Sequence, residues 1–168
     1  NYQAGRGVFT LSFWFNVSGN AVTGATRAIF GHGAQGSRKS LCVYMKKDTL
    51  RTSLYDSLNA PGATALDVRG ITTSNYANSQ WHLYTLTANI GSVQVYLDTV
   101  QKAATTSYLS GTTTYNPPDT ILFGKYLTGS YAYGGKLDDI RMYTRALSVA
   151  DVKLLYTQGP PTVATGAA

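Results

Sequence analysis

Hydrophobic and polar residues alternate along several short segments of this chain, and the clearest of them is residues 9–17. Its odd-numbered positions are all apolar and those between them are mostly polar: Phe9, Leu11, Phe13, Phe15 and Val17 alternate with Thr10, Ser12, Trp14 and Asn16. A period of two places successive side chains on opposite faces of an extended chain. The pattern therefore predicts a β-strand with one buried face.

Shorter segments of the same kind follow, separated by stretches rich in Gly, Ser, Thr, Asn and Pro. We expect strands at residues 28–30, 41–45, 50–55, 81–88, 92–100, 121–123 and 136–143, with an edge strand near 65–68 inside a long loop at 59–79. Because these strands form hairpins and no helices alternate with them, the pattern favours an all-β fold, an antiparallel two-sheet sandwich.

A single helix is predicted, close to the end of the chain. Ser148 followed three residues later by Asp151 forms a variant of the capping box, and Gly159-Pro160 supplies a stop signal. We expect a helix over about residues 149–157, with Leu147 packing onto its first turn. Its buried side chains should be Val152, Leu155 and Tyr156.

Composition supports one β-rich domain. The 168 residues include 17 Gly and 13 Tyr, and charged residues make up only 13%, against a typical value of about 25%. We place the domain at residues 1–159 and interpret 160–168 as a tail or linker. All eight acidic residues are Asp, which excludes every Glu-dependent catalytic or metal site. No segment approaches the roughly 20 apolar residues of a membrane-spanning helix, so we expect no membrane insertion.

The chain is basic, with a formal net charge of +6 and a pI near 9.4. Its cations are spread out except in one region, which holds Arg38, Lys39, Lys46, Lys47 and Arg51. This region is interpreted either as a solvated hairpin or as a patch for an anionic glycan, a membrane surface or a nucleic acid. No nucleic-acid-binding motif accompanies it, so no nucleic acid is expected as a partner. The only cysteine, Cys42, is expected to be a small buried hydrophobic residue.

Four segments, in order, resemble the concanavalin A-like, laminin-G-like domain family. They are residues 9–15, Trp81-His82, residues 95–98 and residues 135–148. The last is the most specific, because it looks like the family's G-x-(I/L)-D-D-(V/I)-R-(I/M)-Y-x-R-A-L-S signature before a terminal helix. The resemblance implies a jelly-roll sandwich that is usually a non-catalytic module of an extracellular, cell-surface or virion protein. It also implies glycan binding and, in some members, a calcium ion.

One departure from the family concerns the start of the chain, which begins with Asn1 rather than Met. Members of the family usually carry a further strand ahead of the segment resembling Asn1-Tyr2, beside the final Asp-Asp strand. Its absence would leave an open sheet edge. A shortened chain, residues that a structure does not show, or a strand supplied by a neighbour would each account for it.

The first candidate site is the pair Asp138 and Asp139. Asp138 shares parity with Ile140 and Met142, so we expect its carboxylate to point inward and to need a partner. That partner is either an arginine, Arg141 or Arg145, or a calcium ion completed by backbone carbonyls, Asp139 or Asn16. Because Ca²⁺ takes six to eight oxygen ligands, such a site would be weak or mainly structural.

Aromatic side chains form the second candidate site, since sugar rings stack on Tyr and Trp. Tyr126, Tyr131 and Tyr133 lie in a Gly- and Ser-containing segment and are interpreted either as a binding platform or as loop and subunit packing. Trp14 and Tyr96 have the parity of an outer face, where they line a groove unless a loop such as 59–79 covers them. Trp81 is expected in the core.

Catalysis has little support in the sequence. His32 and His82 lie in a Gly turn and at a strand entry, without a nucleophile elbow or metal-ligand spacing. Adjacent Asp138 and Asp139 point to opposite faces of a regular strand, which is the wrong geometry for acid-base work.

The sequence therefore predicts a non-catalytic glycan-binding or adhesion module of an extracellular, surface or virion protein. Its partners would be a glycan or glycoprotein and a larger parent protein. The alternative is a structural assembly protein, such as a virion decoration, tail or filament subunit, in which sister subunits exchange strands. Low charge, Tyr and Thr richness and the missing strand motivate this alternative.

Overall fold

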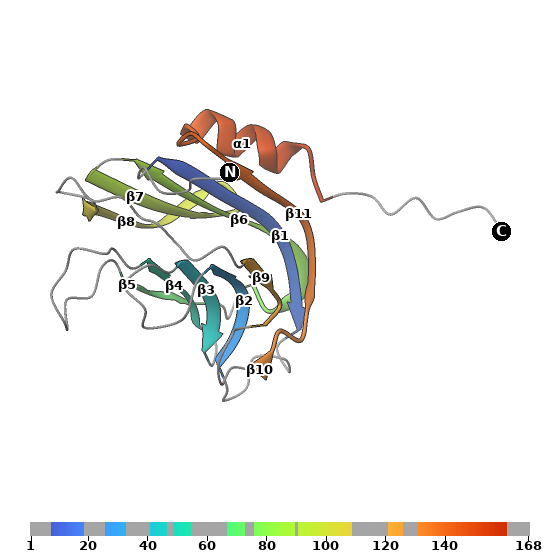
Figure 1. The fold of residues 1–168 in the computed structure, drawn as a ribbon. Helices are drawn as coiled ribbons and strands as arrows, with labels where there is room; N and C mark the ends of the chain where they lie inside the picture. Colours follow the sequence, from blue (N-terminus) through green and yellow to red (C-terminus); the bar gives the residue numbers. More distant parts are fainter. Residues whose placement is uncertain are drawn as a thin grey trace, which may run out of the picture.

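A computed structural model describes residues 8–18, 26–32, 41–46, 49–54, 67–72, 76–89, 91–108, 121–125 and 131–160 of the chain. These residues form two stacked β-sheets and one helix (Figure 1). The sandwich confirms the predicted all-β, antiparallel fold.

The five-stranded sheet has the order β11-β1-β6-β7-β8. Its strands are β1 (Phe9–Ser18), β6 (Asn78–Asn89), β7 (Gly91–Leu97), β8 (Val100–Tyr108) and β11 (Lys136–Tyr143). All four pairings within it are antiparallel. The first and last described strands of the chain therefore lie side by side, with β11 at the margin of the sheet.

The six-stranded sheet has the order β10-β2-β3-β4-β5, and β9 also pairs with β2. Its strands are β2 (Thr26–His32), β3 (Leu41–Lys46), β4 (Thr49–Leu54), β5 (Asp67–Thr72), β9 (Ile121–Phe123) and β10 (Tyr131–Ala132). Among the described strands of this sheet, β10 alone runs parallel to its neighbour. Figure 1 shows this sheet packed beneath the five-stranded one.

The core lies between the two sheets and consists of the alternating apolar positions that the sequence indicates. Phe13 stacks on Tyr84, with 4.8 Å between ring centroids. The hydroxyls of Tyr84 and Thr52 lie 2.6 Å apart and form a buried hydrogen bond between the sheets. Burial raises the pKa of the Tyr84 phenol well above its ordinary value, so this side chain is a neutral hydrogen-bonding group.

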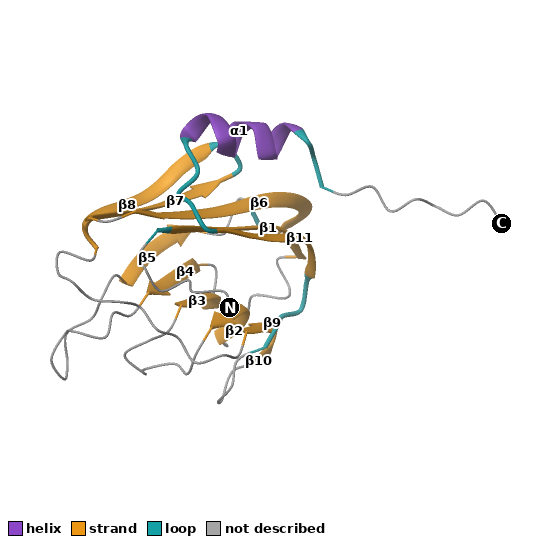
Figure 2. Ribbon diagram, turned by 45° about the horizontal axis from the view of Figure 1, so that its top comes forward, coloured by secondary structure: helices purple, strands orange, loops and turns teal. Residues whose placement is uncertain are grey.

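Helix α1 (Val149–Thr157) lies on the outer face of the five-stranded sheet (Figure 2). The Ser148 hydroxyl accepts a bond from the Asp151 amide, and the Asp151 carboxylate accepts one from the Ser148 amide. The predicted helix and its capping box are thus confirmed. Among the described residues, no helix is long and apolar enough to cross a membrane.

Two strands were not predicted. The run at 92–100 is broken by a turn at Asp98-Thr99, after which the chain returns as β8. Strand β10 is only two residues long.

Candidate functional site

Helix α1 closes the outer face of the five-stranded sheet. Trp14 of β1 stacks on Tyr156 of the helix, with 5.7 Å between ring centroids, and is 3% exposed. Tyr96 is 2% exposed, in a cluster with Leu147 and Val152. The predicted outer-face parity of Trp14 and Tyr96 is correct, but their assignment as ligand-binding residues is wrong, because the helix leaves no ring surface for a sugar.

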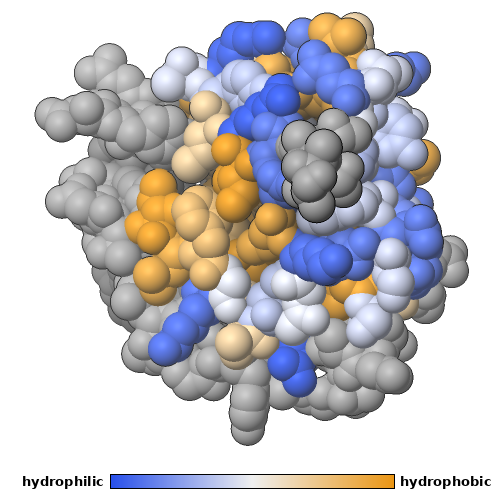
Figure 3. All heavy atoms as spheres, turned by 90° about the vertical axis from the view of Figure 1, so that its right-hand side faces the viewer, coloured by the Kyte–Doolittle hydropathy of each residue, from blue (hydrophilic) through white to orange (hydrophobic). Residues whose placement is uncertain are grey.

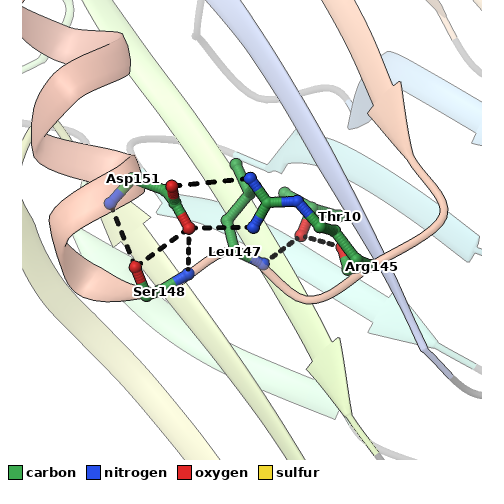
Figure 4. Close-up of polar contacts among 5 residues, drawn as sticks. All are labelled: Thr10, Arg145, Leu147, Ser148 and Asp151. Carbon is green, nitrogen blue, oxygen red and sulfur yellow. Dashed lines mark hydrogen bonds and ion pairs between the residues drawn. The ribbon is translucent and has the colours of Figure 1, made fainter.

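Polar contacts fix the helix to the sheet, as Figure 4 shows. The Thr10 hydroxyl on β1 donates to the Arg145 carbonyl and accepts from the Leu147 amide, each at 2.9 Å. The Arg145 guanidinium contacts the Asp151 carboxylate at 2.9 Å. Together with the Ser148 amide, Arg145 holds the pKa of the Asp151 carboxyl well below its usual range. The signature residues before the helix therefore serve as an anchor.

Strand β11 contains a β-bulge at the predicted metal site. Ser12 of β1 pairs with Arg141, whereas Trp14, two residues later, pairs with Asp138. Two residues of β11, Asp139 and Ile140, thus oppose one residue of β1, and Asp139 adopts φ 47°. A bulge of this kind reverses the inward-outward alternation. Asp138 consequently faces outward beside Trp14, and its predicted inward direction is wrong.

The bulge also decides the partners of the two carboxylates. Asp138 Oδ1 accepts a bond from the Asp139 amide at 2.7 Å, and the Asp139 carboxylate contacts Arg141 Nε at 2.6 Å. The expected Asp–Arg pair exists, but it joins Asp139 rather than Asp138 to Arg141. Among the described residues, no three His, Cys or Asp side chains gather as a metal centre. Calcium at Asp138 and Asp139 stays a prediction.

The predicted tyrosine platform is described only in part. Tyr126 lies outside the described residues, and of Tyr131 the structure describes the backbone, which pairs with Arg27. Tyr133 is half-buried, its hydroxyl donates to the Asn16 carbonyl at 3.2 Å, and burial raises its pKa well above the ordinary value. Tyr133 therefore packs against β1, while Tyr126 and Tyr131 stay predictions.

Two cations of the six-stranded sheet, Lys46 and Arg51, share its outer face with Tyr44. Ala28, Cys42 and Tyr44 form a buried cluster separate from the main core, which confirms the expected burial of Cys42. Arg51 lies directly opposite Tyr44 in the register, and Lys46 follows Tyr44 on the same face.

Lys46 is exposed and Arg51 is half-buried; we call this pair the basic face. The Arg51 Nε is buried without a hydrogen-bond partner among the described residues. Arg38, Lys39 and Lys47 lie outside the described residues. Sequence reasoning grouped Lys46 with Arg51 but did not include Tyr44. Tyr44 lies two residues before Lys46, and this spacing would have placed both on the same face of the strand.

His82 belongs to a different region, at the end of the five-stranded sheet. Its Nδ1 lies 3.1 Å from Asp98 Oδ2, and Asp98 Oδ1 accepts a bond from the Leu83 amide. These contacts fix the turn between β7 and β8. Trp81 is half-buried with the parity of the outer face, so its predicted place in the core is wrong. The side chain of His32 is not among those described.

Comparison with known proteins gives the following matches. A family model described as the concanavalin A-like lectin/glucanases superfamily, of laminin-G type, matches residues 3–153. No curated protein matches the chain.

Several botulinum neurotoxin structures are similar in fold. The receptor binding domain of the C/D mosaic serotype is 15% identical with a TM-score of 0.71, over 92% of this chain and 37% of that one. The receptor binding domain of neurotoxin D is 14% identical with a TM-score of 0.73, over 94% and 39%. The serotype D ligand binding domain in complex with N-acetylneuraminic acid is 15% identical with a TM-score of 0.71, over 95% and 38%. This chain thus spans less than two fifths of each of them.

Proposed function

The chain belongs to the concanavalin A-like lectin/glucanase superfamily, and from this we propose that it is a non-catalytic glycan-binding module of an extracellular or surface protein. The observation that supports it most is the difference between the two outer faces of the sandwich. Helix α1 closes one face over Trp14 and Tyr96. On the other face Ala28, Cys42 and Tyr44 are also buried, but Lys46 is exposed beside the half-buried Arg51 of the neighbouring strand, and this pair of cations is the feature that we propose for recognition.

The chemistry of the basic face favours an acidic sugar. A guanidinium and an ammonium on adjacent strands attract a carboxylate or sulfate group, and Arg offers two parallel donors to it. The net charge of +6 adds long-range attraction for anions.

A structural neighbour supports an acidic sugar as the first ligand to test. The serotype D neurotoxin domain was solved with N-acetylneuraminic acid, a carboxylated sugar. Only 38% of that chain is matched, so the likeness supports the choice of ligand class and not a position for it. Tyr126 and Tyr131 are proposed to contribute sugar-stacking rings, and a calcium ion at Asp138 and Asp139 belongs to the same proposal.

We propose a non-catalytic role because two of the described carboxylates are held in ion pairs with arginines. Glycosidases place two carboxyl groups on either side of the scissile bond. In this chain every acidic residue is Asp, Asp139 pairs with Arg141, and Asp151 pairs with Arg145. A carboxylate held in an ion pair is a poor general acid, because its proton affinity is lowered.

Titration of the full chain with sialylated, sulfated and neutral oligosaccharides, preceded by a glycan array, tests the proposal. We expect binding of at least one acidic glycan, weakened about tenfold by Lys46→Glu through charge reversal. Lys153→Glu, an exposed cation on helix α1 at the opposite face, is the matched control and should bind normally. Repeating the titration with calcium and with EDTA tests the metal. Absence of binding to every glycan would overturn the function, whereas binding insensitive to Lys46→Glu would overturn the site.

A further inference from the structure

The imidazole of His82 lies between two hydrogen-bond acceptors at one end of the five-stranded sheet. Its Nδ1 is 3.1 Å from Asp98 Oδ2, and its Nε2 is 3.1 Å from Asn78 Oδ1. Asp98 belongs to the turn between β7 and β8, whereas Asn78 is the first residue of β6. His82, with 13% of its side chain exposed, therefore joins these two segments from a half-buried position.

Hydrogen bonds from the backbone fix both partners as acceptors. The Gln80 amide donates to Asn78 Oδ1 at 2.9 Å, so turning the Asn78 side-chain amide around would bring two donors together. The Leu83 amide donates to Asp98 Oδ1 at 3.0 Å, and an ionised carboxylate only accepts. A neutral imidazole has one N–H and cannot donate to both partners. The arrangement therefore fits the doubly protonated ring.

The other neighbours of the ring are two aromatic side chains and one more distant cation. Tyr76 meets the imidazole edge to face, with 4.9 Å between ring centroids, and the Phe15 ring of β1 lies 5.9 Å away. The Lys102 ammonium of β8 lies over the Tyr76 ring, 5.5 Å from its centroid. Among the described residues, the ion pair of His82 is with Asp98 alone. The charge in contact with the imidazole is thus negative, which favours the protonated ring.

Residues 78–80, which the ring contacts through Asn78, lie on the surface of the molecule. All three are exposed, and Asn78 pairs with Ser18 at the end of β1. Figure 3 faces the side of the molecule where β1 ends and shows many hydrophilic side chains there. A segment that buries little apolar area opens at a low free energy. Hydrogen bonds, rather than packing, must therefore hold residues 78–80 in place.

The backbone of this segment is also strained. Ser79 adopts φ 64°, a left-handed conformation that costs free energy for a residue with a side chain. The Ser79 carbonyl accepts a bond from Asn16 Nδ2 at 2.9 Å, and Asn78 accepts from both Gln80 and His82. Of the groups in these contacts, His82 is the one that changes its charge near neutral pH.

We propose that His82 is a pH-dependent clasp for residues 78–80. In acidic solution both ring N–H groups donate, one to Asp98 and one to Asn78. As pH rises through the histidine range, the ring releases its Nε2 proton to the solvent, because Nδ1–H stays with the carboxylate, the stronger acceptor. Nε2 and Asn78 Oδ1 then face each other as two acceptors, and their bond is lost. The stabilisation of residues 78–80 is thus present below the histidine range and lost above it.

Nuclear magnetic resonance of the ¹⁵N-labelled full chain between pH 5.5 and pH 8.5 tests the proposal. At low pH both ring nitrogens of His82 should be protonated, and at high pH only Nδ1, the opposite of the tautomer that histidine prefers in water. His82→Gln identifies the ring signals by their absence. The amide signals of Ser79 and Gln80 should shift with the ring. Exchange of the Gln80 amide, relative to an unprotected amide at the same pH, should rise about fivefold to tenfold.

Asp98→Asn is the variant that separates the clasp from other effects of pH. Its Oδ1 can still accept from the Leu83 amide, but its side-chain NH₂ then faces Nδ1 and donates to it. The neutral ring consequently carries its proton on Nε2 and keeps the bond to Asn78. We expect the amides of residues 78–80 in this variant to lose their pH response. Lys102→Gln, which neutralises a nearby charge that does not contact the imidazole, is the control and should respond as the wild type does.

Circular dichroism should show that the variants are folded, and the wild-type tautomer provides a test that needs no variant. A wild-type ring that keeps its neutral proton on Nε2 overturns the proposal. Amides of Ser79 and Gln80 that ignore the titration of the ring, or that respond equally in Asp98→Asn, overturn it as well. The basic face lies on the other sheet, so none of these outcomes bears on glycan binding.

Discussion

The indole of Trp14 stacks on the phenol ring of Tyr156, with 5.7 Å between ring centroids and 25° between ring planes. This contact joins the first described strand to the last helix across most of the chain. It lies on the outer face of the five-stranded sheet, where helix α1 also covers a second, small core of Tyr96, Leu147 and Val152.

Removing the Tyr156 ring should loosen the helix from the sheet. We expect Tyr156→Ala to lower the free energy of unfolding by about 1–2 kcal/mol, since an aromatic pair and its buried area are lost. Leu154→Ala is the matched control, because Leu154 is 59% exposed on the same helix and should change stability by less than about 0.5 kcal/mol. Urea denaturation measures both. Equal effects would show that the stack contributes nothing.

The alternation of apolar residues was sufficient to predict the sandwich and the outward parity of Trp14 and Tyr96. It could not predict what covers these rings, because the docking of helix α1 depends on contacts such as Thr10 with Leu147 that link distant parts of the chain. The family resemblance at residues 135–148 predicted the fold correctly, but it did not indicate that residues of this segment anchor helix α1 to the sheet.

The errors in the predicted sites also have local causes. The bulge in β11 depends on Asp139 at positive φ, and a single aspartate does not signal such a conformation. Its presence reversed the predicted direction of Asp138. The Asp98-Thr99 turn was missed because the turn is only two residues long, no glycine or proline marks the reversal, and the apolar Val100 follows at once.

The acid stability of the helix anchor should depend on Asp151. Arg145 and the Ser148 amide lower the pKa of its carboxyl in the folded chain. Its stabilising contribution is therefore present above the ordinary carboxyl range and is lost as pH falls below it. We expect Asp151→Asn to be less stable than wild type at pH 7 and to lose less stability on acidification. Thermal melting at pH 7 and pH 3 measures this, and parallel losses in the two proteins would contradict it.

The hydrogen bond between Tyr84 and Thr52 should behave as a coupled pair. Tyr84→Phe and Thr52→Val each leave one buried hydroxyl unpaired, at a cost of about 1–2 kcal/mol. The double variant should cost less than the sum, because no unpaired hydroxyl is left. Additive costs, measured by urea denaturation, would contradict the coupling.

The same tyrosine should affect stability in alkaline solution. Burial raises the pKa of Tyr84 in the folded chain, while the unfolded chain ionises in the ordinary tyrosine range. The contribution of Tyr84 is thus present below that range and is lost as pH rises through and above it. We expect Tyr84→Phe to lose less stability than wild type between pH 9 and pH 11 in a melting series, and identical slopes would exclude this cause.

Asp98 stabilises the turn between β7 and β8 through its backbone conformation and its hydrogen bonds more than through its charge. Asp98 adopts φ 58°, its amide donates to the Leu83 carbonyl at 2.7 Å, and its Oδ1 accepts from the Leu83 amide at 3.0 Å. Asn tolerates this backbone region and keeps the acceptor, whereas Ala does neither. We therefore expect Asp98→Asn to cost about 1 kcal/mol or less and Asp98→Ala about 2–4 kcal/mol in urea denaturation. If Asn were as harmful as Ala, the contact of the Asp98 carboxylate with His82 would be dominant instead.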